Sequence, residues 1–441
     1  MKAKLLCVGD LHLGRRPVHL PEDLSEHGLA PTDLAPSAGW RAVVARAKSE
    51  RVDAVLLAGD VVESDNRYFE AFGALETGVR ELVAAGIPVI AVAGNHDVEV
   101  LPRLAREIDG FQLLGVGGEW QERTLERDGR KVVRVIGWSF PVARVEASPF
   151  ASPSFARCAA SPSLTTLGLL HCDLGASASP YAPVSARELA DAPVDAWLLG
   201  HVHAPSLSSG PRPTGYLGSV VGLDPTETGP HGPWLATIDS DSREGRSLEL
   251  VHVPLAPLRW ESLEIALQGD VSAEDVEARI VRSLDELAAR ISASAHRPLA
   301  VGCRIRLTGR IGDPRGLRRG LADTRPESLR RLLGGTLYFV DRVENAATAE
   351  LDLHELARAT DPSGRIARML LALRAEPLSD EARVWIKRSS RDVARVVDRS
   401  AWSVLGAVDT SDDTQRARLV AAGNRALEEL LAQRVESSAH G

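Results

Sequence analysis

Five short apolar runs, each followed closely by a small group of polar residues, constrain the fold of this chain more than any other feature. The runs are Leu5–Val8, Val55–Leu57, Val89–Val92, Leu167–Leu170 and Trp197–Leu199. Short aliphatic runs of this kind are typical of buried strands. The polar groups after them are Asp10-x-His12, Gly59-Asp60, Gly94-Asn95-His96-Asp97, His171 and Gly200-His201-x-His203. We therefore expect these polar side chains to lie where strands end and loops begin.

Carboxylates, imidazoles and an amide gathered in this way are the ligands that a pair of divalent metal ions needs. Such a pair activates water and neutralises the charge on phosphoryl oxygens when a phosphate ester is hydrolysed. Asp60 is the natural bridging ligand, because it lies centrally in the series and Gly59 permits a sharp turn after the strand. The other predicted ligands form one group of Asp10, His12 and His203 and a second group of Asn95, His171 and His201.

His96 is adjacent to a predicted ligand but points differently along an extended segment. We expect it to act as the catalytic histidine, either by stabilising the transition state or by protonating the leaving oxygen. Asp97 either orients that imidazole or caps the helix that follows, and capping is the favoured interpretation. Among the remaining histidines, His231 alone is spaced to return to the rim of the site, although a surface loop is the expected place for it.

The alternation of strands and helices predicts a layered α/β domain over residues 1–255. Up to about residue 120, apolar runs alternate with helical segments near 38–50 and 67–85, which favours a largely parallel sheet. From 120 to 255 the predicted strands are shorter and indicate a second sheet.

Residues 256–345 are predicted to form a small α+β domain after a proline-containing linker at 254–257. Its expected elements are an amphipathic helix that begins near Ser272, a strand at 301–308, a helix at 326–333 and a strand at 336–343. The stretch 304–331 holds nine arginines. These form either a phosphate-contacting face or an ordinary solvated surface. Residues 346–441 are predicted to be helical, with breaks near Pro362, Pro377 and 409–413.

The composition fits an ordinary globular protein and places few limits on partners. With 44% hydrophobic and 25% charged residues among 441, the disordered, collagen-like and coiled-coil classes are excluded. The net charge of -8 does not indicate nucleic-acid binding, but metal-binding carboxylates contribute to it. The four cysteines lack paired spacing and are expected to be buried thiols in a reducing compartment. The chain shows no signal-like or membrane-spanning run, and a cytoplasmic location is expected.

The five polar strings resemble the signature of the calcineurin-like metallophosphoesterases. Asp10–Gly14, Gly94–Asp97 and Gly200–His203 are similar to the corresponding strings of the SbcD-type DNA exonucleases, a family that includes YhaO-like proteins. Tyr216–Ser219 resembles the Tyr-Pro-Gly-Ser turn of that family, with leucine in place of proline. The resemblance covers residues 1 to about 255.

This resemblance implies two manganese ions and a DNA substrate. The implied metal ligands are Asp10, His12, Asp60, Asn95, His171, His201 and His203, with His96 as the catalytic histidine. It also implies that 256–345 is a capping domain and that the C-terminal helices dock on an SbcC-like coiled-coil ATPase, in a homodimer. One departure is Glu63, which stands where some members carry a second active-site histidine.

The expected activity is that of a metal-dependent DNA exonuclease, with endonuclease action also open, in double-strand-break repair. A small-molecule or nucleotide phosphoesterase is the alternative within the same fold. A DNA-end-binding scaffold with a structural metal site is the third. The long extension behind the first domain favours a long substrate or a protein partner.

Overall fold

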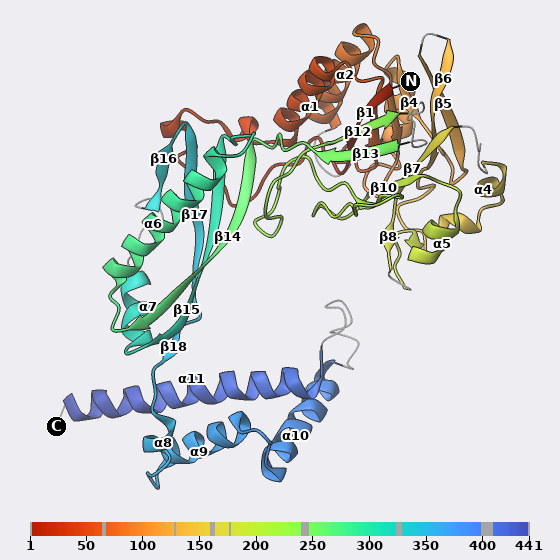
Figure 1. Ribbon diagram of the computed structural model, residues 1–441. Coiled ribbons are helices and arrows are strands. Elements are labelled where there is room, and N and C mark those ends of the chain that lie inside the picture. The colour runs from red at the N-terminus through yellow and green to blue at the C-terminus, as the bar shows by residue number, and fades with distance from the viewer. Residues whose placement is uncertain are drawn as a thin grey trace. The chain divides into compact units, whose positions relative to one another are not determined.

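The computed structural model describes residues 2–63, 68–127, 129–158, 164–175, 178–239, 247–322, 329–397 and 409–439. The chain divides into two compact units (Figure 1). The first unit comprises Met1–Leu263, Ile280–Ile305 and Arg325–Val343, and the second comprises Glu264–Arg279, Arg306–Thr324 and Glu344–Gly441. Among the described residues, no helix is long and apolar enough to cross a membrane.

Two sheets in the first unit confirm the layered α/β fold. The first has the order β13-β12-β1-β2-β3-β4, and β1 to β4 are parallel. The second has the order β11-β10-β7-β6-β5. The strands of the first sheet are β1 (Lys2–Val8), β2 (Ala54–Ala58), β3 (Val89–Val92), β4 (Phe111–Leu113), β12 (Trp234–Asp239) and β13 (Ser247–His252). Those of the second are β5 (Gln121–Arg127), β6 (Arg130–Trp138), β7 (Thr165–His171), β10 (Ala196–Gly200) and β11 (Thr214–Tyr216).

The apolar runs are continuous because both faces of the central strands are buried. Side chains alternate between the faces of a strand. Leu56 therefore faces the core between the two sheets, where it joins Leu169 and Leu198. Val55 and Leu57 of the same strand join the core that includes helix residues such as Trp40. Parallel sheets covered on both faces commonly read as uninterrupted apolar runs.

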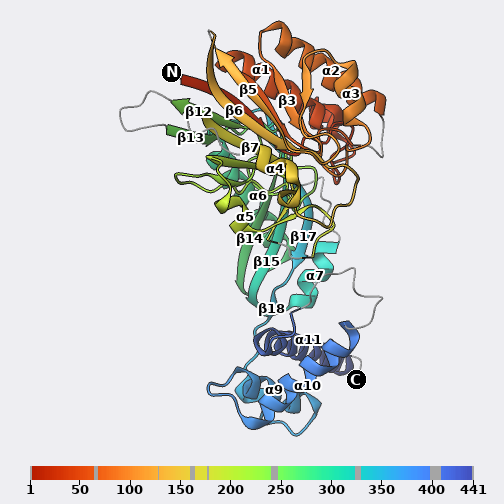
Figure 2. The same cartoon turned by 90° about the vertical axis from the view of Figure 1, so that its right-hand side faces the viewer.

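Helices cover the outer face of the first sheet. They are α1 (Pro36–Glu50), α2 (Tyr68–Ala84) and α3 (Leu101–Glu107), which lie together in the same part of the unit (Figure 2). The first two confirm the helices predicted near 38–50 and 67–85, with residue 67 outside the described residues. The outer face of the second sheet packs against shorter elements, among them α4 (Pro153–Arg157) and α5 (Ala186–Asp191). The short pair β8 (Asp173–Leu174) and β9 (Pro183–Val184) forms a small separate sheet.

The predicted α+β elements are present with one correction. The sheet order is β14-β15-β17-β16, with β18 (Thr348–Ala349) paired to β15. The four main strands of this sheet are β14 (Leu258–Gly269), β15 (Ala300–Ile311), β16 (Arg331–Leu333) and β17 (Thr336–Asn345). The two helices of this part of the chain are α6 (Ala273–Ser292) and α7 (Pro314–Ala322). The expected helix at 326–333 is wrong over the part of this range that the structure describes. Residues 323–328 lie outside the described residues, and Arg331–Leu333 is a strand.

The reason is a tight hairpin. Leu333 pairs with Thr336, and the two residues between them, Gly334 and Gly335, have φ of 59° and 85°. Two-residue hairpin loops with left-handed backbone favour glycine, so the Gly-Gly pair fixes a strand on each side.

The C-terminal part of the second unit is helical, as predicted. It contains α8 (Leu353–Leu356), α9 (Pro362–Arg374), α10 (Asp380–Val397) and α11 (Asp412–Ala439). Pro362 occupies the first turn of α9, and Asp361 caps that helix by accepting from Gly364 N at 2.8 Å. Leu370 of α9 and Leu427 of α11 are buried in one small core.

Several of the nine arginines in 304–331 are held by acidic partners. The pairs are Arg304–Asp341, Arg315–Glu429, Arg330–Asp23 and Arg331–Asp285. Arg325 lies outside the described residues. These pairs reduce the number of arginines that are available to contact phosphate.

Candidate metal centre

The polar strings come together because their strands end at neighbouring edges. Asp10 and Asp60 follow the parallel strands β1 and β2. In the other sheet, His171 ends β7 and lies opposite Gly200, the last residue of β10. The carboxyl ends of parallel strands are the usual place for functional residues in α/β sheets.

The backbone of three predicted ligands is strained. His12, Asp60 and His201 have φ of 46°, 48° and 108°, values that residues with a Cβ rarely adopt. Such conformations cost free energy and persist mainly where function requires them. Their coincidence with predicted ligands supports this loop cluster as the candidate functional site.

Glycines in the strings allow the loops to approach one another. A Cβ on Gly94 would lie 2.1 Å from Asp60 Oδ1, and a Cβ on Gly200 would lie 2.1 Å from the Ala58 carbonyl oxygen. Neither distance is sterically permitted. Both glycines are therefore required for the present position of the carboxylate and of the strand behind it.

We expect Gly94→Ala to weaken Mn²⁺ binding by about tenfold or more, because the new methyl group displaces Asp60. Losses of about 10–100-fold are typical when the support of a metal ligand is disturbed. Calorimetric titration with Mn²⁺ measures the effect, and circular dichroism verifies the fold. Gly73→Ala in α2 is the matched control, because its Cβ would meet nothing within 4 Å. Equal Mn²⁺ affinity in Gly94→Ala and the parent protein would contradict the steric account.

One candidate ligand group consists of Asp10, His12 and His203. Each offers an atom within 4.8 Å of the others. The Nε2 atoms of the two histidines are 3.1 Å apart. Asp10 is 1% exposed, and its Oδ2 is buried without a hydrogen-bond partner in the described part of the chain. Its Oδ1 accepts a hydrogen bond from the His201 backbone N–H at 2.8 Å.

Carboxylates behind these two imidazoles fix their orientation. His12 Nδ1 lies 3.2 Å from Glu63 Oε2, and His203 Nδ1 lies 2.7 Å from Glu227 Oε1. Burial raises the pKa of Glu227, but the hydrogen bond and charge of His203 outweigh burial and lower it. An ionised carboxylate only accepts, so each Nδ1 donates its proton and each Nε2 presents a lone pair.

The second candidate group is centred on His171. Its Nδ1 donates to the Ala58 carbonyl oxygen at 3.1 Å, which leaves the Nε2 lone pair facing inward. Nε2 lies 3.4 Å from Asp60 Oδ2 and 3.1 Å from Asn95 Oδ1. Asp10, Asp60 and His171 also offer atoms within 4.8 Å of one another. The ring of His201 lies 5.2 Å from that of His171, centroid to centroid.

These residues fit a divalent metal pair. Two imidazole lone pairs at 3.1 Å repel each other unless a cation or a proton relieves them. The buried Asp10 Oδ2 likewise lacks a donor. Asp60 Oδ2 faces the Nε2 atoms of both His12 and His171, at 3.7 and 3.4 Å, so Asp60 would be placed to bridge two ions held by the two groups. The lone pairs of histidine and carboxylate oxygens suit Mn²⁺ and Zn²⁺ alike. The structure thus brings the predicted ligands together, and their individual roles remain predictions.

His96 lies beside the candidate ligands without belonging to either group. Its side chain is 42% exposed, and its Nδ1 lies 3.0 Å from Glu63 Oε1. The hydrogen bond to Glu63 raises the pKa of His96 to about 9. The same contact, after that of His12, lowers the pKa of Glu63. Glu63 therefore joins a predicted ligand to the predicted catalytic histidine through its two oxygens.

Asp97 neither orients His96 nor caps a helix, so both interpretations of it are wrong. It is fully buried and accepts hydrogen bonds from Val61 N at 2.6 Å and from Gly94 N at 2.7 Å. The side chain ties the loop after β2 to the loop after β3. Burial raises its pKa well above the usual range.

The sequence patterns did not identify one residue that supports the site, Glu227, and predicted the wrong environment for another, His231. Glu227 lies 24 residues after His203, in an ordinary loop string that carries no local signal. His231 is buried, not in a surface loop, and its Nε2 lies 3.1 Å from the Glu227 carbonyl oxygen. Its Nδ1 lies 3.0 Å from both the hydroxyl and the carbonyl oxygen of Ser219. His231 therefore supports the loop of Glu227 from behind.

The layered α/β fold and the cluster of candidate metal ligands are those expected of a metallophosphoesterase domain. Residues 3–205 match the family model described as calcineurin-like phosphoesterase.

Two curated proteins are similar to this chain in sequence. The uncharacterized metallophosphoesterase YhaO of Bacillus subtilis is 27% identical over 240 residues, which are 50% of this chain and 53% of that protein. The DNA double-strand break repair protein Mre11 of Aeropyrum pernix is 29% identical over 279 residues, 61% of this chain and 65% of that protein. The matches thus span about half to two thirds of the relatives' length.

Among solved structures, a dimetal phosphatase from Danio rerio aligns with a TM-score of 0.33 and 14% identity, over 54% of this chain and 94% of that one. The family match and the two curated relatives support the prediction of a hydrolase that acts on phosphoester bonds.

Proposed function

We propose that this protein is a Mn²⁺-dependent DNA nuclease of the SbcD type, an exonuclease with endonuclease capacity that acts in double-strand-break repair. The observation that carries the proposal is the paired ligand cluster at the strand ends, with His96 beside it. The similarity to Mre11 supports DNA as the substrate.

The proposed ligands are Asp10, His12, Asp60, Asn95, His171, His201 and His203. When bound, the two ions supply an activated water molecule and stabilise charge on the phosphoryl oxygens. The chain's own residues then divide the remaining work. Glu63 and Glu227 hold the imidazoles of His12 and His203 in orientation. His96, protonated through its contact with Glu63, donates a proton to the leaving oxygen.

The test is cleavage by the purified full chain with Mn²⁺. The substrates are linear duplex DNA, single-stranded DNA and bis-p-nitrophenyl phosphate, a small diester. We expect the protein to shorten at least one of the two forms of DNA from an end. Cleavage of the small diester alone would favour the phosphoesterase alternative. Binding of Mn²⁺ without cleavage of any substrate would favour the third alternative, a DNA-end-binding scaffold.

We further propose a homodimer that works with an SbcC-like coiled-coil ATPase, docked on the C-terminal helices. Val384 and Val396 of α10 are 62% and 50% exposed and offer apolar contact area on this helical part. Co-expression with the product of a neighbouring gene that encodes a Walker-motif ATPase with long heptads is the test. We expect the two chains to elute together in gel filtration, with two copies of this chain by light scattering. Separate elution would contradict the docking proposal.

A further inference from the structure

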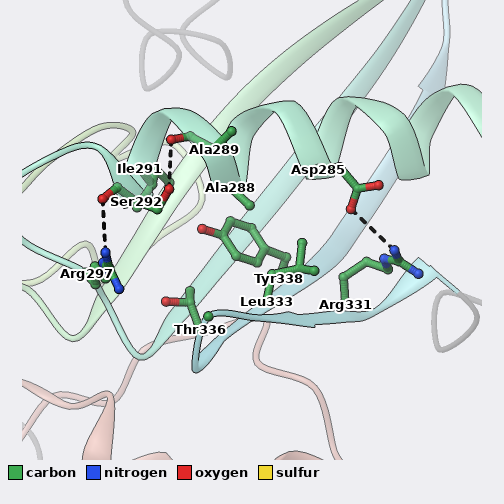
Figure 3. Close-up of a pocket in the computed structure, with 11 residues that line it drawn as sticks. Asp285, Ala288, Ala289, Ile291, Ser292, Arg297, Arg331, Leu333, Thr336 and Tyr338 are labelled. Atoms are coloured by element: carbon green, nitrogen blue, oxygen red, sulfur yellow. Dashed lines mark hydrogen bonds and ion pairs between the residues drawn. The ribbon is translucent and has the colours of Figure 1, made fainter.

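A cavity of about 470 Å³ lies in the first unit, between α6 and the β16–β17 hairpin. Ala288, Ala289, Ile291 and Leu333 give it an apolar wall. Figure 3 shows these residues around the ring of Tyr338, whose hydroxyl points into the cavity. Pockets of about 300–1,000 Å³ with an apolar lining and a few polar groups are typical ligand sites.

The hydroxyl of Tyr338 is an accessible polar group of the cavity lining. The residue is 2% exposed as a whole, its hydroxyl is open to the cavity, and it forms no hydrogen bond with another described residue. Burial raises the pKa of Tyr338, so the hydroxyl stays protonated and can donate. The hydroxyl is therefore available to water or to a ligand in the cavity.

The cavity also carries positive charge that its own acid does not neutralise. Arg331 Nη2 pairs with Asp285 Oδ1 at 3.4 Å, and the Nε of Arg331 is buried without an acceptor in the described part of the chain. Arg297 donates to the Ser292 carbonyl oxygen at 3.3 Å and has no acidic partner among the described residues (Figure 3). The lining thus offers the Tyr338 hydroxyl as a donor and the Arg297 guanidinium as a cation without an acidic partner among the described residues.

We propose that this cavity binds a small organic oxyanion with an apolar body, such as an aryl or alkyl phosphate or carboxylate. The oxyanion accepts from Tyr338 and pairs with Arg297, and the apolar body lies against Ala288, Ala289 and Leu333. An oxyanion matches spare donors and a cation, whereas a neutral apolar ligand leaves both unsatisfied. The inference does not depend on the proposed function, because none of these residues belongs to the candidate metal centre.

The test is binding of phenylphosphonate and of benzoate to the metal-free full chain in EDTA, by isothermal titration calorimetry. Phenol, which has the ring without the oxyanion, and inorganic phosphate, which has the oxyanion without the ring, are the comparison ligands. We expect phenylphosphonate or benzoate to bind with a dissociation constant of about 1 mM or below. Both comparison ligands should bind at least about tenfold more weakly.

Two conservative variants localise the binding. Tyr338→Phe removes only the hydroxyl, and Arg297→Gln removes only the charge. Each should weaken binding by about tenfold, the cost of one hydrogen bond to a charged group. Arg106→Gln on exposed α3 is the matched charge control and should bind like the parent protein. Thermal melting verifies that each variant folds.

Unchanged binding in both variants would place the anion elsewhere and overturn the proposal. Equal binding of phenol, or no binding of either anion at 10-fold the expected dissociation constant, would overturn it as well. DNA cleavage is measured separately, so failure of the cavity and failure of the nuclease proposal are distinguishable.

Discussion

Replacement of His96 by alanine is expected to reduce DNA cleavage by about 10²–10⁴-fold, the range that a general acid or base typically contributes. The physical reason is its position. It contacts Glu63 at 3.0 Å and is 42% exposed at the side chain, so it can reach a substrate oxygen without occupying a ligand position. Single-turnover cleavage with saturating Mn²⁺ measures the effect.

Manganese binding separates a catalytic from a structural role for His96. The variant should bind Mn²⁺ with the affinity of the parent protein, because His96 is outside both candidate ligand groups. His354→Ala, at an exposed position of α8, is the control and should cleave normally. A His96→Ala protein that cleaves at the parental rate would remove His96 from the mechanism. Loss of Mn²⁺ binding in that variant would make it a ligand instead.

The second large effect is expected for Asp60→Asn. Asp60 Oδ2 faces the imidazoles of His12 and His171, and these histidines outweigh burial and lower the pKa of Asp60. The amide keeps the size of the side chain but removes the charge that would hold two cations close together. Mn²⁺ binding should therefore weaken by more than the ~10–100-fold that is typical for the loss of an outer-shell partner. Cleavage should fall below detection.

Calorimetric titration with Mn²⁺ measures this effect, with Asp191→Asn as the control. Asp191 pairs with Arg187 on the surface of α5 and is 73% exposed at its side chain, so the control should bind metal normally. Parental Mn²⁺ affinity in Asp60→Asn would show that Asp60 does not bridge.

The layered domain could be predicted because its signal is local. Apolar runs such as Val89–Val92 are strands with both faces buried, and the polar strings follow directly at their ends. The expected helix at 326–333 is wrong over Arg331–Leu333, where the structure has a strand. Gly334-Gly335 in the sequence signals a hairpin that requires strands on both sides, and the helix prediction did not weigh this signal.

For the candidate site, the sequence predicted the ligand residues but not the partners that orient them. The strings themselves identify ligand-type residues, and the structure places them together. The orientation of each imidazole depends on partners that are distant in sequence, and no local pattern marks them. Glu227 holds His203 across 24 residues, and Glu63 holds His12 across 51 residues. Asp97 was misassigned because its partners, Val61 and Gly94, become visible only when two loops meet.

The most direct test of this account is the number of Mn²⁺ ions that one chain binds. Equilibrium dialysis of the parent protein against increasing Mn²⁺, followed by elemental analysis, gives that number without reference to activity. The paired ligand groups around Asp10, Asp60 and the facing histidines predict saturation at two ions per chain. Saturation at one ion, or no binding in excess of an Asp60→Asn chain, would contradict a two-metal centre at this site.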